Sequence, residues 1–184
     1  MNIETERLYI RNGTIEDFVR VYEYNFTKLQ DIAGEFKYEK QDPKNVESWF
    51  SGDILNYYKE LESKNNHDLI LYLKEGNIPI GNLILDRINE EENSIEITCH
   101  VHPNYWGNNY MKECLLAVLP KIFELGFSSV IYSYGFGNIK SEKLCSKLGF
   151  ELESIKKDDY IRNGVSIDTY RNILTKEQFY KLHK

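Results

Sequence analysis

The clearest pattern in the chain is a set of apolar positions at helical spacing in its second half. Six apolar side chains between residues 111 and 122 predict a helix with one buried face: Met111, Cys114, Leu115, Val118, Leu119 and Ile122. Just ahead, residues 94–101 (SIEITCHV) alternate between apolar and polar side chains, which predicts a half-buried strand. A short polar loop joins the two. The centre of the chain is therefore predicted to be a strand, a loop and a helix.

The rest of the chain predicts further short strands and helices. We expect strands at residues 8–11, 68–74, 78–86, 129–134, 151–156 and 165–174. We expect helices at residues 14–26, 42–63 and 138–148, and a last helical turn or two after Thr175. Gly81 indicates a bulge in its strand, and Pro120 predicts a bend or break in the central helix near residues 116–120. This order predicts an α/β sheet with helices on both faces.

Composition narrows the classes of protein to consider. The chain has 184 residues, 41% hydrophobic and 28% charged, which predicts one globular domain over residues 1–184. Its net charge of -6 gives no electrostatic case for nucleic acid as a partner, but suits a cationic acceptor. The three cysteines form no CxxC pair and have no His at metal-ligand spacing, so we expect neither disulfides nor a metal site. With no apolar run of membrane-spanning length and no signal-peptide core, we expect a cytoplasmic protein without a membrane partner.

The loop between the central strand and helix has the chemistry of an anion site. Gly107 and the pair Asn108-Asn109 can adopt left-handed backbone conformations, which turn successive amides toward one point. The first amides of the following helix have no partner within the helix, and the helix dipole favours negative charge there. The sequence therefore predicts a phosphate or pyrophosphate site.

Three stretches of the chain have distinctive motifs. Residues 102–110 read HPxxWGxxY after a strand, residues 138–150 read NxxSxKxxxxLGF, and residues 4–11 read ETERLYIR. Together they resemble the GNAT acetyltransferase superfamily, and most closely its branch of ribosomal-protein N-terminal (alanine or serine) acetyltransferases. The resemblance implies a single-domain GNAT fold, with a mixed, mostly antiparallel, twisted sheet of about seven strands and helices on both faces. It also implies acetyl-CoA as co-substrate and no metal.

The chain departs from the family pattern at three positions. The family loop, Arg or Gln, two residues, Gly, one residue, Gly or Ala, starts here at Trp106. Asn109 then replaces the central Gly, and Met111 replaces the small last residue that lets the pyrophosphate approach. Cys145 stands where many members place a Tyr as the acid for the leaving thiolate.

The resemblance also assigns residues to the co-substrate. Asn138 would bond the pantetheine amide, Ser141 would lie near the thioester sulfur, and Lys143 would touch CoA. From the residues alone, Asn138 is equally a helix N-cap, and Lys143 equally part of a solvated face. The remaining implied contacts are in the central strand and loop: Cys99, Val101, Trp106, Gly107, Asn108, Asn109, Tyr110 and Met111.

The implied reaction is direct attack of an amine on the thioester. The amine must lose its proton, and alternation along the central strand places Glu96 and His100 on one face, as candidate bases, with Cys99 on the other. Glu96 aligns with a Glu that is frequent in the branch, whereas His100 has the ordinary pKa closer to neutral pH. A backbone N–H near Cys99 to Val101 would stabilise the thioester oxygen, and Ser141 is the remaining candidate acid.

Several alternatives stay open. The acceptor could be a protein N-terminus or a small amine such as a polyamine or an aminoglycoside, and the protein could be a monomer or a homodimer. The departures at Asn109, Met111 and Cys145 leave a non-catalytic CoA-binding module as the rival. A nucleotide-binding protein is a more distant alternative, since the chain has neither GxxxxGK[ST] nor GxGxxG.

Overall fold

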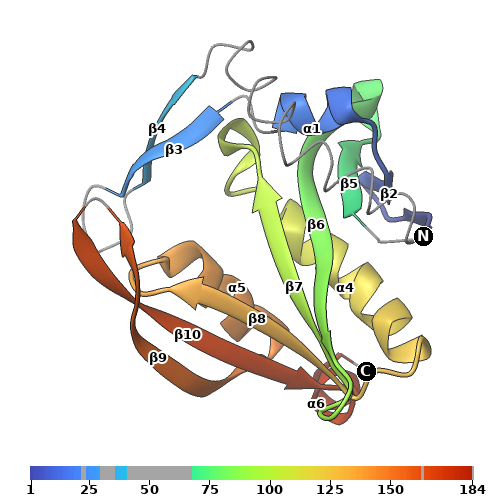
Figure 1. Ribbon diagram of the computed structural model, residues 1–184. Coiled ribbons are helices and arrows are strands. Elements are labelled where there is room, and N and C mark those ends of the chain that lie inside the picture. The colour runs from blue at the N-terminus through green and yellow to red at the C-terminus, as the bar shows by residue number, and fades with distance from the viewer. Residues whose placement is uncertain (22–23, 30–35, 41–67, 163, 184) are drawn as a thin grey trace. The chain divides into compact units, whose positions relative to one another are not determined.

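The computed structural model describes residues 1–21, 24–29, 36–40, 68–162 and 164–183 (Figure 1). Its main sheet has eight strands in the order β1-β2-β5-β6-β7-β8-β10-β9, and β3 (Tyr24–Leu29) pairs with β4 (Phe36–Lys40) in a second sheet. In the main sheet, β7 and β8 are parallel, whereas the pairs β1–β2, β2–β5, β5–β6, β8–β10 and β9–β10 are antiparallel. A mixed, mostly antiparallel sheet was predicted, with about seven strands where eight are found. By contacts along the chain the molecule divides into two units, and the division falls within β3, β4, β6, β7 and α4.

The first unit comprises residues 1–25, 38–85 and 99–117. Its strands are β1 (Ile3–Glu4), β2 (Leu8–Asn12), β5 (Asp68–Leu73), the start of β6 (Ile78–Asn89) and the end of β7 (Ser94–Val101). The predicted hairpin forms through the turn η1 (Glu75–Asn77), where Gly76 and Asn77 have positive φ. Helix α1 (Ile15–Val21) begins after the predicted capping box, in which the Asp17 carboxylate accepts from the Thr14 N–H at 2.9 Å. The core of this unit consists of fully buried aliphatic side chains: Leu8, Ile10, Leu69, Leu71, Ile80 and Leu83.

The second unit comprises residues 26–37, 86–98 and 118–184. After the second half of α4 (Tyr110–Glu124) come β8 (Ser129–Gly135), α5 (Ile139–Leu148), β9 (Glu151–Arg162), β10 (Val165–Thr175) and α6 (Lys176–Leu182). Strand β8 runs parallel to β7, with Glu96 opposite Ile131, and antiparallel to β10. The predicted cap at Thr175 is a full capping box with Gln178. The core of this unit is again apolar: Ile95, Ile97, Leu119, Ile122, Val130, Ile131, Leu148, Leu174 and Phe179.

Three predicted boundaries are wrong. The first helix ends at Val21, and residues 24–26 belong to β3 instead. Of the bend or break expected near Pro120, the break is not found: α4 is continuous, because the buried residues on both sides, Leu119 and Ile122, keep the helix packed although one backbone donor is missing. The strand expected to end at residue 156 is β9, which continues to Arg162, since its pairing with β10 extends that far. The helix predicted at residues 42–63 lies outside the described residues.

Gly81 is the point where β6 lets the end of β7 approach closely. The register of β6 against β5 shifts at this position, which confirms the predicted bulge. A Cβ at Gly81 would overlap the carbonyl oxygen of His100 on β7. Just beyond, the His102 N–H donates to the Ile80 carbonyl at 2.8 Å. Only a residue without a side chain leaves room for this backbone contact, which fixes the strand end from which the central loop departs.

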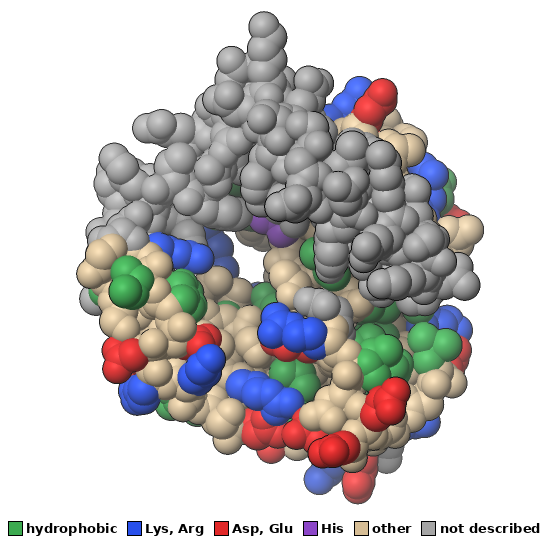
Figure 2. Space-filling view, in the orientation of Figure 1, with side chains coloured by type: hydrophobic (Ala, Val, Ile, Leu, Met, Phe, Trp, Pro, Cys, Tyr) green, Lys and Arg blue, Asp and Glu red, His purple; other side chains and the backbone are tan. Residues whose placement is uncertain are grey.

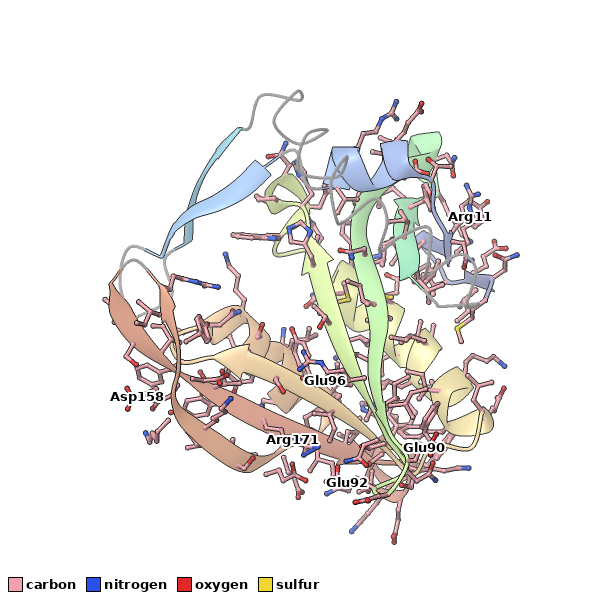
Figure 3. All side chains as sticks on the ribbon, in the orientation of Figure 1. Arg11, Glu90, Glu92, Glu96, Asp158 and Arg171 are labelled. Carbon is pink, nitrogen blue, oxygen red and sulfur yellow. The ribbon has the colours of Figure 1, made fainter. Side chains whose placement is uncertain are left out.

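Charge is mixed on the surface. Figure 2 shows acidic and basic side chains interspersed over the described part of the face in view. The negative net charge of the chain therefore does not form one continuous acidic patch on that part of the face. On β10, for example, Arg171 pairs with Glu92 at 3.0 Å and also with Glu153 (Figure 3).

Candidate functional site

The central loop is held to the end of β7 by the side chain of its first motif residue. The indole N–H of Trp106 donates to the carbonyl of Val101 at 2.6 Å. Between them, residues Pro103–Tyr105 form the single turn η2, which His102 caps by accepting from the Asn104 N–H at 3.2 Å. The Trp106 side chain therefore ties the start of the loop back to the end of β7. An aromatic residue with an N–H donor is suited to this position.

The loop then bends through two left-handed residues. Gly107 has φ 82° and Asn109 has φ 60°, as predicted, whereas Asn108 is not among the positive-φ residues. The Asn108 side chain instead donates to the carbonyls of Tyr105 and Trp106, both at 3.2 Å. These bonds hold the loop backbone in its bent shape.

Helix α4 begins directly after the bend. The first helical hydrogen bond is from the Glu113 N–H to the Asn109 carbonyl at 3.0 Å. The amides of Tyr110, Met111 and Lys112 therefore precede the helical ladder and lie at the positive end of the helix dipole. A Cβ built on Gly107 would meet nothing within 4 Å, so the backbone is open at this point. The donors and the open space together fit an anion such as a pyrophosphate.

The other candidates of the first unit lie on the last residues of β7. Burial first, and then the nearby Cys99 thiol, raise the pKa of Cys114, which is fully buried on α4. Both ring nitrogens of His100 are buried. Burial, followed by the neighbouring His102, lowers the pKa of His100 to about 4. The expectation that His100 titrates near neutral pH is therefore wrong, because the sequence did not reveal its burial.

In the second unit, Glu96 lies on β7 with 18% of its side chain exposed (Figure 3). Its carboxylate faces the guanidinium of Arg87 on β6, with 3.4 Å between Oε2 and Nε. The next residue on the same side, Thr98, is exposed. Glu96 is thus a half-buried carboxylate with access to solvent, as a base needs.

Helix α5 carries the remaining candidates. Asn138 caps it by accepting from the Ser141 N–H at 3.2 Å, so the N-cap interpretation is confirmed. Lys143 is exposed, and the helix ends at Gly149 with φ 86°. The Ser141 hydroxyl shares a hydrogen bond of 3.1 Å with the hydroxyl of Tyr132 on β8. Cys145 is only 2% exposed and belongs to the core.

The sequence profile of the acetyltransferase (GNAT) domain matches residues 7–151. The chain belongs to the GNAT family. It is accordingly an acyltransferase, and its sheet is the mixed sheet expected for this family. No curated protein matches the chain at a significant level.

Solved GNAT structures resemble this fold over nearly its whole length. An acetyltransferase of the GNAT family from Bacillus anthracis is 22% identical, with TM-score 0.69 over 96% of this chain and 99% of the other. A ribosomal-protein-S5-alanine acetyltransferase from Vibrio fischeri is 19% identical, with TM-score 0.73 over 97% and 98%. A spermidine N-acetyltransferase chimera from Vibrio cholerae and hSSAT is 18% identical, with TM-score 0.71 over 97% and 100%. The second of these is of the branch that the sequence motifs resemble.

Two departures from the GNAT loop pattern have a structural explanation. Asn109 adopts the left-handed conformation for which the family uses Gly. Met111 is 8% exposed and sits on the core side of α4, so its side chain does not fill the space in front of the loop. Neither residue therefore argues against an anion binding at this loop.

Sequence reasoning missed two groups of residues. Tyr132 could have been suspected, because its strand leads directly into α5, but nothing in the sequence indicated its bond to Ser141. Thr5 and Arg7 were noted only as part of the opening motif, although both bind Glu113 at the start of α4.

Within the described residues, no group of three His, Cys, Asp or Glu could hold a metal, and no helix is long and apolar enough to cross a bilayer.

Proposed function

We propose that the protein is an acetyl-CoA-dependent N-acetyltransferase that transfers the acetyl group directly to a primary amine, with residues 1–184 as one domain. The observation that carries this proposal is the loop from Trp106 to Met111. Two left-handed residues, at Gly107 and Asn109, lead into a helix whose first amides are available at an open backbone. In a GNAT chain this arrangement fits the pyrophosphate of CoA.

Acetyl-CoA supplies an activated thioester whose leaving group is a thiolate. In this proposal the loop amides bind the pyrophosphate, and the backbone of Cys99 to Val101 aligns the pantetheine arm and donates to the thioester oxygen. Asn138 and Lys143, on α5 of the second unit, are the further residues that the family resemblance assigns to CoA. The Asn138 Oδ1 already accepts from Ser141, so its amide nitrogen is the group that remains to donate to the ligand.

The preferred base is Glu96. His100 is disfavoured because both of its ring nitrogens are buried, away from an incoming amine. Glu96 is preferred because its carboxylate, which faces Arg87, is partly exposed, so that a water molecule can connect it to the amine. Proton transfer through such a water to Glu96 is the route that we propose.

The preferred acid for the thiolate is Ser141, assisted by Tyr132. The position where many GNAT members have a Tyr is the buried Cys145, which is a poor donor. The hydroxyl of Tyr132 stands 3.1 Å from Ser141 and can pass a proton to it. A tyrosine hydroxyl is thus available on β8 instead of on α5.

The acceptor class that we propose is a primary amine, on a protein N-terminus or on a polyamine. The structural neighbours named for ribosomal-protein alanine and spermidine acetylation support both, and the net charge of -6 suits a cationic acceptor. The rival is a CoA-binding module without turnover, which the buried Cys145 favours. Release of CoA thiol from acetyl-CoA across a panel of peptides and polyamines separates the two. Amine-dependent thiol release supports the enzyme, and tight CoA binding without release with any amine supports the module.

A further inference from the structure

The carboxylate of Glu113, in the first turn of α4, binds the chain segment that joins β1 to β2. Its Oε1 accepts from the Thr5 hydroxyl at 2.5 Å and from the Arg7 N–H at 2.9 Å. Its Oε2 accepts from Nε of Arg7 at 2.7 Å. One carboxylate therefore fixes the backbone and the side chain of Arg7 against the start of the helix that follows the anion loop.

Glu113 would by itself oppose an anion at this helix end. Burial would raise the pKa of its carboxyl, but the hydrogen bonds from Thr5 and Arg7 outweigh burial and hold the pKa below its ordinary value. Glu113 is therefore ionised at neutral pH. The ion pair with Arg7 offsets its negative charge, so that the helix end remains suited to an anionic ligand.

The Arg7 guanidinium also reaches the loop. Its Nη2 donates to the carbonyl of Asn108 at 3.1 Å, and its Cζ lies 4.5 Å from the centre of the Tyr110 ring. Arg7 thus contacts both neighbours of Asn109. The peptide bond between Asn108 and Asn109 is planar and trans, so its carbonyl and its N–H point in opposite directions. A carbonyl held toward Arg7 directs the Asn109 N–H away from Arg7.

We propose that Arg7, held in place by Glu113, is a positioning residue that orients the Asn109 amide for the pyrophosphate of CoA. This inference rests on the proposed function. The planar fork of an arginine can bond a carboxylate and a carbonyl at the same time, which the single ammonium of a lysine does at poorer geometry. Arg7 therefore acts through the geometry of its side chain as well as through its charge.

The test compares Arg7→Lys and Glu113→Gln with the wild type. We expect each change to weaken CoA binding by about tenfold in calorimetry, because the Asn109 N–H is then no longer held in the binding orientation before CoA arrives. Turnover of S-acetylpantetheine, which carries the same thioester without the pyrophosphate, should change less than twofold. The amide signal of Asn109 in a nitrogen–proton correlation spectrum of the ligand-free protein should move in Arg7→Lys.

A matched control is Lys74→Met, which removes another ion pair of the first unit, 2.6 Å from Glu4, without touching the loop. It should leave CoA affinity unchanged. CoA binding by Arg7→Lys within twofold of the wild type, or an equal loss with S-acetylpantetheine, would overturn the positioning role. If the wild type itself does not bind CoA, the proposed function fails and this inference fails with it.

Discussion

The hydroxyls of Tyr132 and Ser141 lie 3.1 Å apart, one on strand β8 and one on helix α5. Strand and helix are consecutive in the chain, and Ser141 is further fixed by its backbone bond to the Asn138 side chain. In the mechanism that we propose, this pair of hydroxyls is the relay that delivers a proton to the leaving thiolate.

Tyr132→Phe tests this relay. If Tyr132 assists Ser141 in protonating the thiolate, kcat should fall by about tenfold, with the KM for acetyl-CoA nearly unchanged. Ser141→Ala should lower kcat by a similar factor. The double variant should lower kcat by no more than the larger of the two single effects, because both groups act in one relay. Tyr170→Phe, which removes a hydroxyl from a ring stacked 5.9 Å from Tyr134, serves as control. Additive losses in the double variant would contradict the relay.

Glu96→Gln tests the base. The amide keeps the size of the carboxylate but cannot accept a proton, so kcat/KM for the amine should fall by about 100-fold while CoA affinity stays within a factor of about two. His100→Ala should have a small effect on the chemistry once folding is accounted for. A limb of the wild-type pH profile that disappears in His100→Ala would instead make His100 the base. Nearly full activity in both variants would mean that water alone relays the proton.

His100 also predicts how stability depends on pH. Its pKa is about 4 in the folded protein against an ordinary 6.5, so between these values the unfolded chain binds more protons than the folded one. The free energy of unfolding should therefore fall by up to about 3 kcal/mol as the pH drops through this window. Glu113 and Asp17, whose pKa values are lowered, add their loss only at more acidic pH. Urea unfolding at pH 7 and pH 5 should show a smaller difference for His100→Gln than for the wild type.

Much of the local structure could be predicted, because it depends on neighbouring residues in the sequence. The alternation over residues 94–101, the helical spacing from Met111 and the caps at Asn138 and Thr175 are local signals, and all four elements are where they were expected. Burial and distant contacts were not predicted. The pKa of His100 depends on atoms packed around it, and the bonds of Glu113 join residues more than 100 positions apart. The ends of α1 and β9 were also missed, because pairing with other strands decided them.

Two glycines should respond differently to alanine. A Cβ at Gly81 would overlap the His100 carbonyl, so Gly81→Ala must push β6 and β7 apart and should destabilise the protein by about 3 kcal/mol. Gly107→Ala meets nothing within 4 Å and has only its φ of 82° to strain it, which should cost about 1 kcal/mol. Denaturant unfolding of both variants measures the difference. Equal losses would contradict the close approach of the strands at Gly81.

The most direct measurement of the proposed function is the affinity for CoA of a protein changed only at Asn109. Asn109→Gly keeps the amide and the left-handed backbone, so calorimetry should give an affinity equal to or better than that of the wild type. Asn109→Pro deletes the amide and forbids φ 60°, and should abolish CoA binding in a protein whose circular dichroism shows it folded. Unchanged CoA affinity in folded Asn109→Pro would contradict the assignment of this loop as the pyrophosphate site.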